Sequence, residues 1–387
     1  MNVLLNLESL APPLTGVGRY THEILKGVAG SKEVGRVYSF VHHRWVDPCD
    51  FVADSGHESG AAGRRKFQAV KDVIKKIPYA FQLKNNLDDL FFYRQTKKLK
   101  NCLYHETNYV CRPFPGPKVV TVHDLSHMHY PGYHPRDRVE WLNKGLSKSL
   151  GNAKRIITVS RYVKDELVEV MQVDPLRVKH IPLGVNPEYR VRYGSEVLPV
   201  LEKYNIHDHR YVLVVGTLEP RKNLRGLLDA YSRLPIKLRQ EHPLVVVGAR
   251  GWRQADFQRQ MAALAARGEV LPLGYVPESD LPFIYAGAYG LAFPSLYEGF
   301  GLPPLEAMAC GVPVLAGRSS SIPEVVGQEA LLVDPHDPGS ILNGLHRLLE
   351  DSEFRTRAAS QGPLRARRFT WERCVQETIK VYKEVYS

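Results

Sequence analysis

Short apolar runs rich in β-branched residues recur along the chain, separated by stretches with helical periodicity. The runs are NVLLNL (2–7), KVVTVHD (118–124), RIITVS (155–160), VKHIPLG (178–184), YVLVVG (211–216), LVVVGA (244–249), GLAFPS (290–295) and VPVLAG (312–317). Continuous apolar strands alternating with amphipathic helices are typical of parallel sheets that helices cover on both faces. The pattern therefore predicts a doubly wound α/β fold.

The series of strands restarts at Tyr211, after a stretch rich in proline, glycine and charge (184–199). Such a stretch suits a connection between domains, and 387 residues are more than one core usually holds. We expect two Rossmann-like domains, in 1–186 and 187–369. The final segment, 370–387, has apolar residues on one helical face and is predicted to pack back on the first domain.

Composition narrows the class of protein. Hydrophobic residues at 44% and charged residues at 24% argue against wholesale disorder. Five cysteines without a C-x-x-C pair argue against a disulfide framework or a zinc site. The first residues lack a basic region typical of signal peptides, and no apolar run is long enough to cross a bilayer. We expect a cytoplasmic protein that is soluble or peripheral on the inner face of the cytoplasmic membrane.

Two strand-to-helix loops carry residues suited to phosphate, and ligands of open parallel sheets bind beyond the carboxyl ends of strands. Gly16 and Gly18 follow the first strand, where glycines let the backbone approach a ligand, although a G-x-G pair can also be only a tight turn. Arg221 and Lys222 follow Gly216, and two cations there could bind a diphosphate, although an R-K pair is commonly solvated surface charge.

A third loop follows the run GLAFPS; Glu298 lies at its start, and Glu306 lies in the predicted helix after it. Pro303 or Pro304 suits the first position of a helix, which places Glu306 in its first turn, where the helix dipole favours an acid. Backbone amides around the glycines could bind an anion, while the two carboxylates accept hydrogen bonds from sugar hydroxyls. The amides belong to Gly299, Phe300, Gly301 and Leu302. The combination suits a sugar nucleotide.

The string from Glu298 to Glu306 resembles the E-x7-E motif of the retaining glycosyltransferases of group 1, family GT4, which have the GT-B fold. Other strings also resemble the family, so the resemblance covers nearly the whole chain. They are TGVGRY, VTVHDL, ITVSRY, IPLGVN, GTLEPRKN and SIPEVVG. The resemblance implies two doubly wound domains that face each other across a cleft, with the acceptor bound by the first and the nucleotide sugar by the second.

The resemblance also implies roles for single residues. Glu306 would bind the ribose hydroxyls of the donor, and Glu298 with the Phe300 and Gly301 backbone would hold the transferred sugar. The diphosphate would be neutralised by Lys222 and Arg221. Gly18 and its neighbour Gly16 would meet the diphosphate from the first domain, and His123 would lie beside the reacting carbon. The nucleobase would lie by Tyr275 and Val276. Thr217 stands where many relatives have a further arginine.

The form G-T-x-x-P-R-K-N is similar to bacterial mannosyl- and rhamnosyltransferases of surface-polysaccharide assembly. We therefore expect transfer of mannose or rhamnose from a GDP-sugar to a glycan or polyprenyl-linked acceptor, in O-antigen or lipopolysaccharide biosynthesis. The sequence has no D-x-D triplet, and cations are available for the leaving diphosphate, so we expect no metal and no other cofactor. A non-catalytic relative that binds nucleotide sugar is one alternative. A nicotinamide-dependent oxidoreductase is another, but Thr21 stands where its G-x-G-x-x-G needs a glycine.

A formal charge of +11 indicates an anionic partner. Residues 64–100 are rich in lysine and arginine, and part of the segment has apolar residues at helical spacing. Such a segment can lie on an anionic membrane, or its apolar face can pack on the first sheet while the lysines are solvated. Nucleic acid is not expected, because aromatic residues are not grouped with the basic ones.

Overall fold

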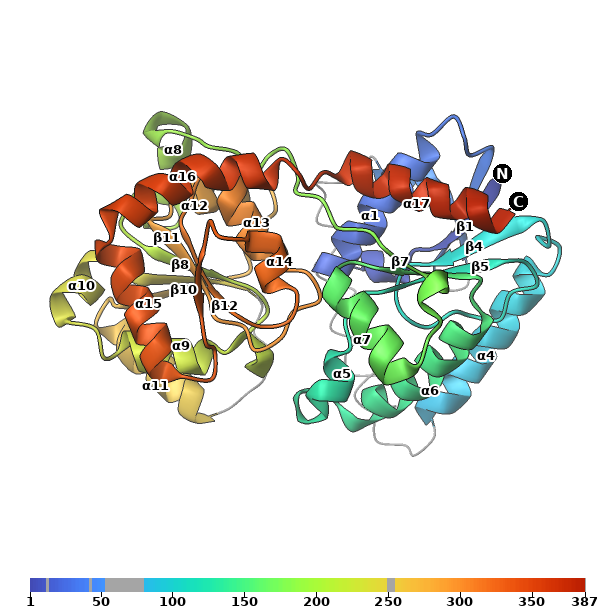
Figure 1. The fold of residues 1–387 in the computed structure, drawn as a ribbon, viewed down its shortest axis with the longest axis horizontal. Helices are drawn as coiled ribbons and strands as arrows, with labels where there is room; N and C mark the ends of the chain where they lie inside the picture. Colours follow the sequence, from blue (N-terminus) through green and yellow to red (C-terminus); the bar gives the residue numbers. More distant parts are fainter. Residues whose placement is uncertain (12–13, 42–43, 53–79, 249–254, 387) are drawn as a thin grey trace. The chain divides into compact units, whose positions relative to one another are not determined.

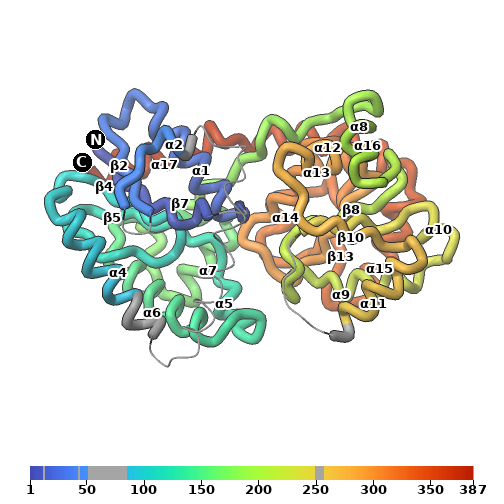
Figure 2. Tube along the Cα trace, turned by 180° about the vertical axis from the view of Figure 1, so that it is seen from behind, coloured from blue at the N-terminus to red at the C-terminus, as the bar shows by residue number. Residues whose placement is uncertain are grey.

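The computed structural model describes residues 1–11, 14–41, 44–52, 80–248 and 255–386. The chain divides into two compact units, which Figure 1 shows as a ribbon and Figure 2 as a tube seen from behind. The first unit consists of Met1–Val159, Lys164–Ile181 and Glu372–Ser387, and the second of Ser160–Val163 and Pro182–Trp371. The chain therefore passes from one unit to the other more than once.

The sheet of the first unit has the strand order β3-β2-β1-β4-β5-β6-β7. Its strands are parallel except for β3, which pairs with β2 in antiparallel fashion. They are β1 (Asn2–Asn6), β2 (Arg36–Val41), β3 (Arg44–Val46), β4 (Cys102–Glu106), β5 (Lys118–Val122), β6 (Arg155–Thr158) and β7 (Val178–His180). The helices are α1 (Gly16–Ala29), α2 (Pro48–Val52), α4 (Ala80–Thr96), α5 (Ser126–His129), α6 (Arg136–Asn152), α7 (Arg161–Met171) and α17 (Trp371–Tyr386).

The sheet of the second unit is parallel throughout, in the order β10-β9-β8-β11-β12-β13. Its strands are β8 (Val212–Val215), β9 (Leu244–Val247), β10 (Val270–Gly274), β11 (Gly290–Phe293), β12 (Val314–Gly317) and β13 (Leu331–Val333). Its helices are α8 (Gly194–Lys203), α9 (Leu224–Tyr231), α10 (Ile236–Glu241), α11 (Ala255–Ala266), α12 (Leu281–Ala286), α13 (Leu302–Ala309), α14 (Ile322–Val326), α15 (Pro338–Glu350) and α16 (Ser352–Ala366). Each unit is thus doubly wound, which confirms the predicted fold class.

The core of the second unit holds the sheet and its helices together. Leu227 and Leu228 of α9, Leu264 of α11 and Leu345 of α15 belong to one buried cluster with strand residues such as Leu244. Each fully buried leucine contributes about 1.5–3 kcal/mol. Helix α13 packs against β11 and β12. The strands whose carboxyl ends carry the predicted site are therefore part of a well-packed core.

Helix α17 lies in the first unit although it ends the chain (Figure 1). The hydroxyl of Tyr382, which is fully buried, lies 2.6 Å from Nδ1 of His105 on β4. The other ring nitrogen of His105 lies 2.8 Å from the hydroxyl of Thr121 on β5, and that hydroxyl also bonds to Tyr20 of α1. Polar contacts as well as apolar ones therefore join α17 to the sheet.

All eight predicted runs contain a strand, but five strands were not predicted: β2, β3, β4, β10 and β13. Of these, β4 lies in the middle of its sheet. Its sequence, CLYHE, ends in polar residues that look unsuited to a buried strand, yet all five are buried. Their polar atoms have partners far away in the sequence, such as Tyr382. Of the predicted basic segment, residues 64–79 lie outside the described residues, and the rest forms α4 and the turn after it.

Candidate active site

The switch point of the second sheet lies between β8 and β11. From β8 the sheet grows through β9 to β10 on one side, and from β11 through β12 to β13 on the other. Ligands of open α/β sheets bind beyond the carboxyl ends of strands at such a point. The loop after β8 carries Arg221 and Lys222, and the loop after β11 carries Glu298. The topology therefore brings three predicted residues together.

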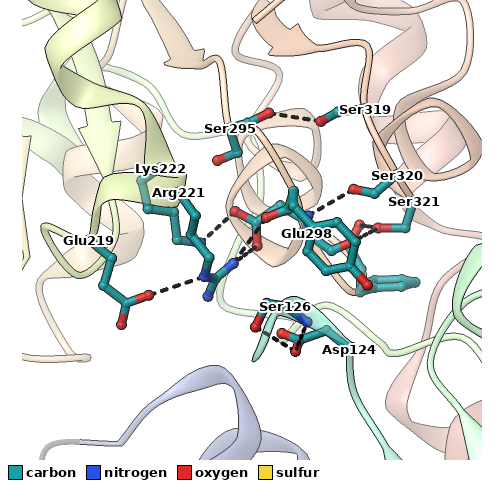
Figure 3. Close-up of polar contacts among 12 residues, drawn as sticks. Asp124, Ser126, Glu219, Arg221, Lys222, Ser295, Glu298, Ser319, Ser320 and Ser321 are labelled. Carbon is teal, nitrogen blue, oxygen red and sulfur yellow. Dashed lines mark hydrogen bonds and ion pairs between the residues drawn. The ribbon is translucent and has the colours of Figure 1, made fainter. Parts of the chain in front are cut away.

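Glu298 forms an ion-pair cluster with these two cations (Figure 3). The residue is 6% exposed. Nζ of Lys222 lies 2.6 Å from one carboxylate oxygen, and Nη1 of Arg221 donates to the other at 3.1 Å. Arg221 also donates from Nε to Glu219 at 3.1 Å and from Nη1 to the carbonyl of Tyr297 at 3.1 Å. Arg221 is thus held by three hydrogen bonds, and Lys222 by its ion pair with Glu298.

The electrostatics of the cluster differ from those of exposed charges. Burial lowers the pKa of the Lys222 ammonium, although the charge of Glu298 opposes this effect. Burial alone would raise the pKa of the Glu298 carboxyl, but the charges of Lys222 and Arg221 together hold that pKa below its usual value. The Glu298 carboxylate is therefore ionised at neutral pH, and it lies between two basic side chains that could contact a diphosphate.

The turn that presents the cations is fixed by hydrogen bonds to neighbouring loops. Residues Pro220–Lys222 form a short 3-10 helix, and Asn223 follows with a left-handed backbone (φ 55°). The amide of Asn223 donates to the carbonyl of Pro335 at 2.6 Å, and the N–H of Leu296 donates to the carbonyl of Arg221 at 2.8 Å. The loops after β8 and β11 are therefore joined through their backbones as well as through the ion pairs.

The second glutamate lies one or two residues deeper in its helix than predicted. Helix α13 begins at Leu302 after Gly301, whose φ of 113° is open to glycine and strained for other residues, and its first turn contains no acid. Glu306 is in the second turn and 3% exposed. The placement in the first turn was wrong because the start of the helix depends on the backbone of Gly301. The helix dipole therefore explains less of this glutamate than expected.

The backbone predicted to bind an anion lies beside the cluster. Gly299, Phe300 and Gly301 lead from Glu298 into Leu302, the first residue of α13. The Phe300 side chain is 5% exposed, and its ring packs edge-on against Phe369 at 5.8 Å between centroids. The Phe300 side chain thus anchors the loop that joins Glu298 to α13.

The remaining predicted residues of the second unit follow other strand ends. Thr217 is exposed in the loop after β8. Tyr275 and Val276 follow β10, where Tyr275 is 52% exposed and Val276 is buried. Strand β10 is at the edge of the sheet, on the β8 side of the switch point. The structure does not bring these residues into the Glu298 cluster.

In the first unit, the glycine loop is part of a helix. Gly16 and Gly18 lie in the first turn of α1, and the hydroxyl of Thr15 caps the helix by accepting from the N–H of Gly18 at 3.3 Å. A Cβ atom on Gly18 would lie 2.8 Å from the carbonyl oxygen of Ser9. The two glycines were predicted to precede this helix, and the structure has them inside its first turn. Close packing against Ser9 explains why residue 18 is a glycine.

His123 lies just beyond the carboxyl end of β5 and is 7% exposed. Its Nε2 lies 2.8 Å from the carbonyl oxygen of Thr107, which can only accept, so Nε2 carries the proton and Nδ1 is an acceptor. The ring packs edge-on against Tyr20 at 5.0 Å and Tyr109 at 5.9 Å. Burial lowers the pKa of His123, so the ring is neutral at pH 7.

Comparisons with known proteins decide the family. The family model for glycosyl transferases group 1 matches residues 201–365, and that for glycosyltransferase family 4 matches residues 106–189. O-antigen chain mannosyltransferase B of Escherichia coli is 36% identical over 99% of this chain and 100% of its own. The chain belongs to the group 1 glycosyltransferases. O-antigen chain mannosyltransferase RfbU of Salmonella typhimurium is 30% identical to this glycosyltransferase, over 62% of each chain.

Solved structures show the same fold. HepE of Anabaena, determined in complex with UDP-glucose, has a TM-score of 0.74 at 18% identity and covers 99% of this chain and 100% of its own. WaaG, a glycosyltransferase involved in lipopolysaccharide biosynthesis, has a TM-score of 0.72 at 17% identity and covers 98% of this chain and 99% of its own. The glycosyltransferase therefore has the GT-B fold, and the predicted family and fold are confirmed.

Sequence reasoning missed Glu219 and the three serines Ser319–Ser321 of this glycosyltransferase. Glu219 orients Arg221, and the serines bond to the loop that carries Glu298. Glu219 could have been found, since it stands two residues before a predicted cation. Ser321 begins the string SIPEVVG, but the role of the serines could not have been found, because their partners are more than 20 residues earlier in the sequence.

Within the described ranges, no group of three or more His, Cys, Asp or Glu side chains is placed to hold a metal ion. Among the same residues, no helix is both long and apolar enough to cross a membrane.

Proposed function

We propose that this glycosyltransferase transfers mannose from GDP-mannose, with retention of configuration, to a glycan acceptor of surface-polysaccharide assembly such as O-antigen. Support comes from the full-length similarity to the Escherichia coli O-antigen chain mannosyltransferase B. GDP-rhamnose is the second candidate donor. The first unit binds the acceptor, and the second binds the nucleotide sugar.

The observation that carries the proposal is the cluster of Lys222, Arg221 and Glu298 at the switch point of the second sheet. The two cations stabilise the charge that develops on the leaving diphosphate, the role that a metal has in other transferases. Glu298 holds the transferred sugar with lone pairs that the ion pairs leave available, and Glu306 binds the ribose. His123, neutral and buried, lies beside the reacting carbon.

The test is a donor survey in the presence and absence of EDTA. Purified full-length protein is incubated with GDP-mannose, GDP-rhamnose and UDP-glucose, and release of nucleotide and melting temperature are measured. We expect turnover with GDP-mannose that EDTA leaves unchanged, and stabilisation by GDP through mass action. Turnover with UDP-glucose alone would contradict the donor, and loss of turnover in EDTA would contradict the metal-free mechanism.

Two matched variants distinguish a specific role of Lys222 at the diphosphate from a general effect of losing one positive charge. Lys222→Gln removes a cation of the cluster, whereas Lys237→Gln removes one that is 82% exposed at its side chain in the same unit. We expect Lys222→Gln to lower turnover about 100- to 1,000-fold, the range for loss of one contact to developing charge. Lys237→Gln is expected to change turnover less than twofold. Equal effects of the two variants would contradict the assignment.

We also propose that the acceptor is reached at an anionic membrane through α4 and the turn after it. Leu87, Leu90 and Phe91 are spaced on one face of α4 and are 58%, 50% and 37% exposed. Arg94 continues this face in the last turn, and exposed Lys97 and Lys98 follow the helix. Exposed apolar side chains beside cations suit the boundary of an anionic bilayer, where each cation contributes on the order of 1 kcal/mol.

Vesicle binding tests the membrane proposal. Replacing Arg94, Lys97 and Lys98 by Gln is expected to weaken binding to vesicles that contain phosphatidylglycerol, and binding of the wild type should fall as salt rises. The control replaces Lys26, Lys32 and Lys154, which are exposed elsewhere in the first unit. Equal binding by both triple variants would contradict a docking role for α4. Donor hydrolysis should be unchanged in both.

A further inference from the structure

Three consecutive serines, Ser319–Ser321, join β12 to α14 and bond to the loop that follows β11 (Figure 3). The hydroxyl of Ser319 donates to the carbonyl of Ser295 at 2.8 Å, and that of Ser320 accepts from the N–H of Glu298 at 2.8 Å. Ser321 shares its hydroxyl proton between the carbonyls of Glu298 at 2.9 Å and Phe300 at 3.0 Å. Both backbone polar groups of Glu298 are therefore bound by serine side chains.

The backbone of Ser320 is unusual for its residue type. Its φ is 46°, in the left-handed region of the backbone. Residues other than glycine, asparagine and aspartate rarely adopt this conformation. Strained backbone of this kind persists where the surrounding structure requires it, and it is concentrated at functional sites. Here it places the Ser320 hydroxyl at the N–H of Glu298. Its neighbour Ser321 is fully buried.

The loop needs such contacts because its own sequence gives it little rigidity. Glu298 is followed by Gly299, and Gly301 comes two residues later, so the backbone on that side can adopt many conformations. Yet the Glu298 carboxylate has to meet Nζ of Lys222 at 2.6 Å and Nη1 of Arg221 at 3.1 Å. A shift of about 1 Å at a catalytic group can lower a rate about 100-fold.

We propose that Ser320 and Ser321 are positioning residues, which hold the backbone of Glu298 so that its carboxylate meets Lys222 and Arg221 and supports turnover. The inference rests on the proposed function, because it assigns these serines to the same site. In this role the serines act through the backbone of Glu298 and require no contact with donor or acceptor.

Three variants distinguish the effect of losing a serine hydroxyl from the effect of backbone strain at Ser320. Ser320→Gly removes the hydroxyl and relieves the positive φ, Ser320→Ala removes only the hydroxyl, and Ser321→Ala removes the shared donor. The control is Ser232→Ala, which deletes a hydroxyl that donates to the carbonyl of Leu228 at 2.7 Å at the end of α9. Each protein is first shown to be folded by its melting transition.

The expected result is a fall in kcat of about 10- to 100-fold for the Ser320 and Ser321 variants, with the donor KM changed less than threefold. Ser320→Gly should show this fall without a lower melting temperature, and Ser232→Ala should keep full kcat. If Ser320→Gly and Ser321→Ala keep the wild-type kcat while Glu298→Gln loses it, the serines only stabilise the loop and the proposal is wrong. If Glu298→Gln itself keeps full kcat, the proposed role of Glu298 fails instead.

A second measurement does not depend on turnover. Lys222 faces Glu298, Arg221 and Glu219, and the charge of Glu298 raises the pKa of Lys222 against the effect of burial. If the serines position Glu298, the NMR titration of the Lys222 Cε signal should move to lower pH in Ser320→Gly and Ser321→Ala and stay in place in Ser232→Ala. An unchanged titration in all three variants would overturn the proposal even if no donor were turned over.

Discussion

The switch points of the two sheets each hold a buried glutamate, but the partners of the two glutamates differ. Glu106 ends β4 beside β1 and accepts hydrogen bonds from the hydroxyl of Tyr104 and, at 3.0 Å, from the amide of Asn6. Glu298 follows β11 beside β8 and is bound by two cations. Burial raises the pKa of Glu106 to about 7, whereas the pKa of Glu298 is held below its usual value.

The comparison shows that the sheet topology determines where each glutamate lies, whereas its hydrogen-bond and ion-pair partners determine its ionisation. Around Glu106, neutral donors satisfy the carboxyl and join β1 to β4, and Asn108 adds its N–H at 3.1 Å. Around Glu298, fixed cations keep the carboxylate ionised and remain close to the start of α13. Only the second arrangement suits a ligand that carries a diphosphate and sugar hydroxyls.

The strongest test of this contrast is Glu298→Gln. In the transition state the transferred sugar gains positive charge, so a carboxylate is worth more there than in the ground state. We expect kcat to fall about 10- to 1,000-fold, measured as donor turnover on protein with an intact melting transition. Full kcat in this variant would contradict the claim that Glu298 has a catalytic role and Glu106 a structural one.

The pH profile of Glu298→Gln sharpens the same test. Lys222 must be protonated to act as a cation, and burial already lowers its pKa while Glu298 raises it. Loss of the carboxylate lowers the pKa further, so the variant should lose its residual activity at a lower pH than the wild type as pH rises. An alkaline limb at the same pH in both proteins would contradict this account.

Glu306→Gln is expected to have a smaller effect of another kind. Its contacts to the ribose would be about equal in the ground and transition states, so their loss raises the donor KM and leaves kcat unchanged. A hydrogen bond to a charged group contributes about 1.5–3 kcal/mol, which corresponds to a rise of roughly 10- to 100-fold. Steady-state kinetics with varied donor measure both constants. A fall in kcat at unchanged KM would place Glu306 near the reacting carbon.

Glu106→Gln should affect stability and leave turnover within twofold. Because burial raises the folded-state pKa of this carboxyl, its contribution to stability is complete below about pH 4.5 and is lost as pH rises to about 7. The variant has no such loss, so its free energy of unfolding should exceed that of the wild type at pH 8 by on the order of 1–3 kcal/mol. Denaturant unfolding at pH 4.5, 6 and 8 measures the difference. Parallel pH curves for the two proteins would show that Glu106 is ionised like Glu298.

Much of the fold could be predicted from the sequence, because short continuous apolar runs between helical stretches are typical of parallel strands that are buried on both faces. Strand β4 escaped prediction since the burial of Glu106 depends on Asn6, 100 residues away, and that of His105 on Tyr382, 277 residues away. Local pattern holds no information on partners so distant in the sequence.

The candidate site was predictable where it depends on residue type and spacing, as for Lys222 and Glu298. It was not predictable where it depends on backbone conformation. The start of α13 is set by the positive φ of Gly301, which moved Glu306 into the second turn. The left-handed backbone of Ser320 and its bond to Glu298 likewise follow from the folded loop and from no motif.

The place of α17 has a consequence for the order of events during synthesis. The first unit needs Glu372–Ser387 to complete itself, because Tyr382 closes the buried polar chain through His105 and Thr121. A ribosome makes the whole second unit before it reaches that helix. The second unit can therefore complete its fold before the first unit does. The order in which the two units are completed is then the reverse of the order in which they are translated.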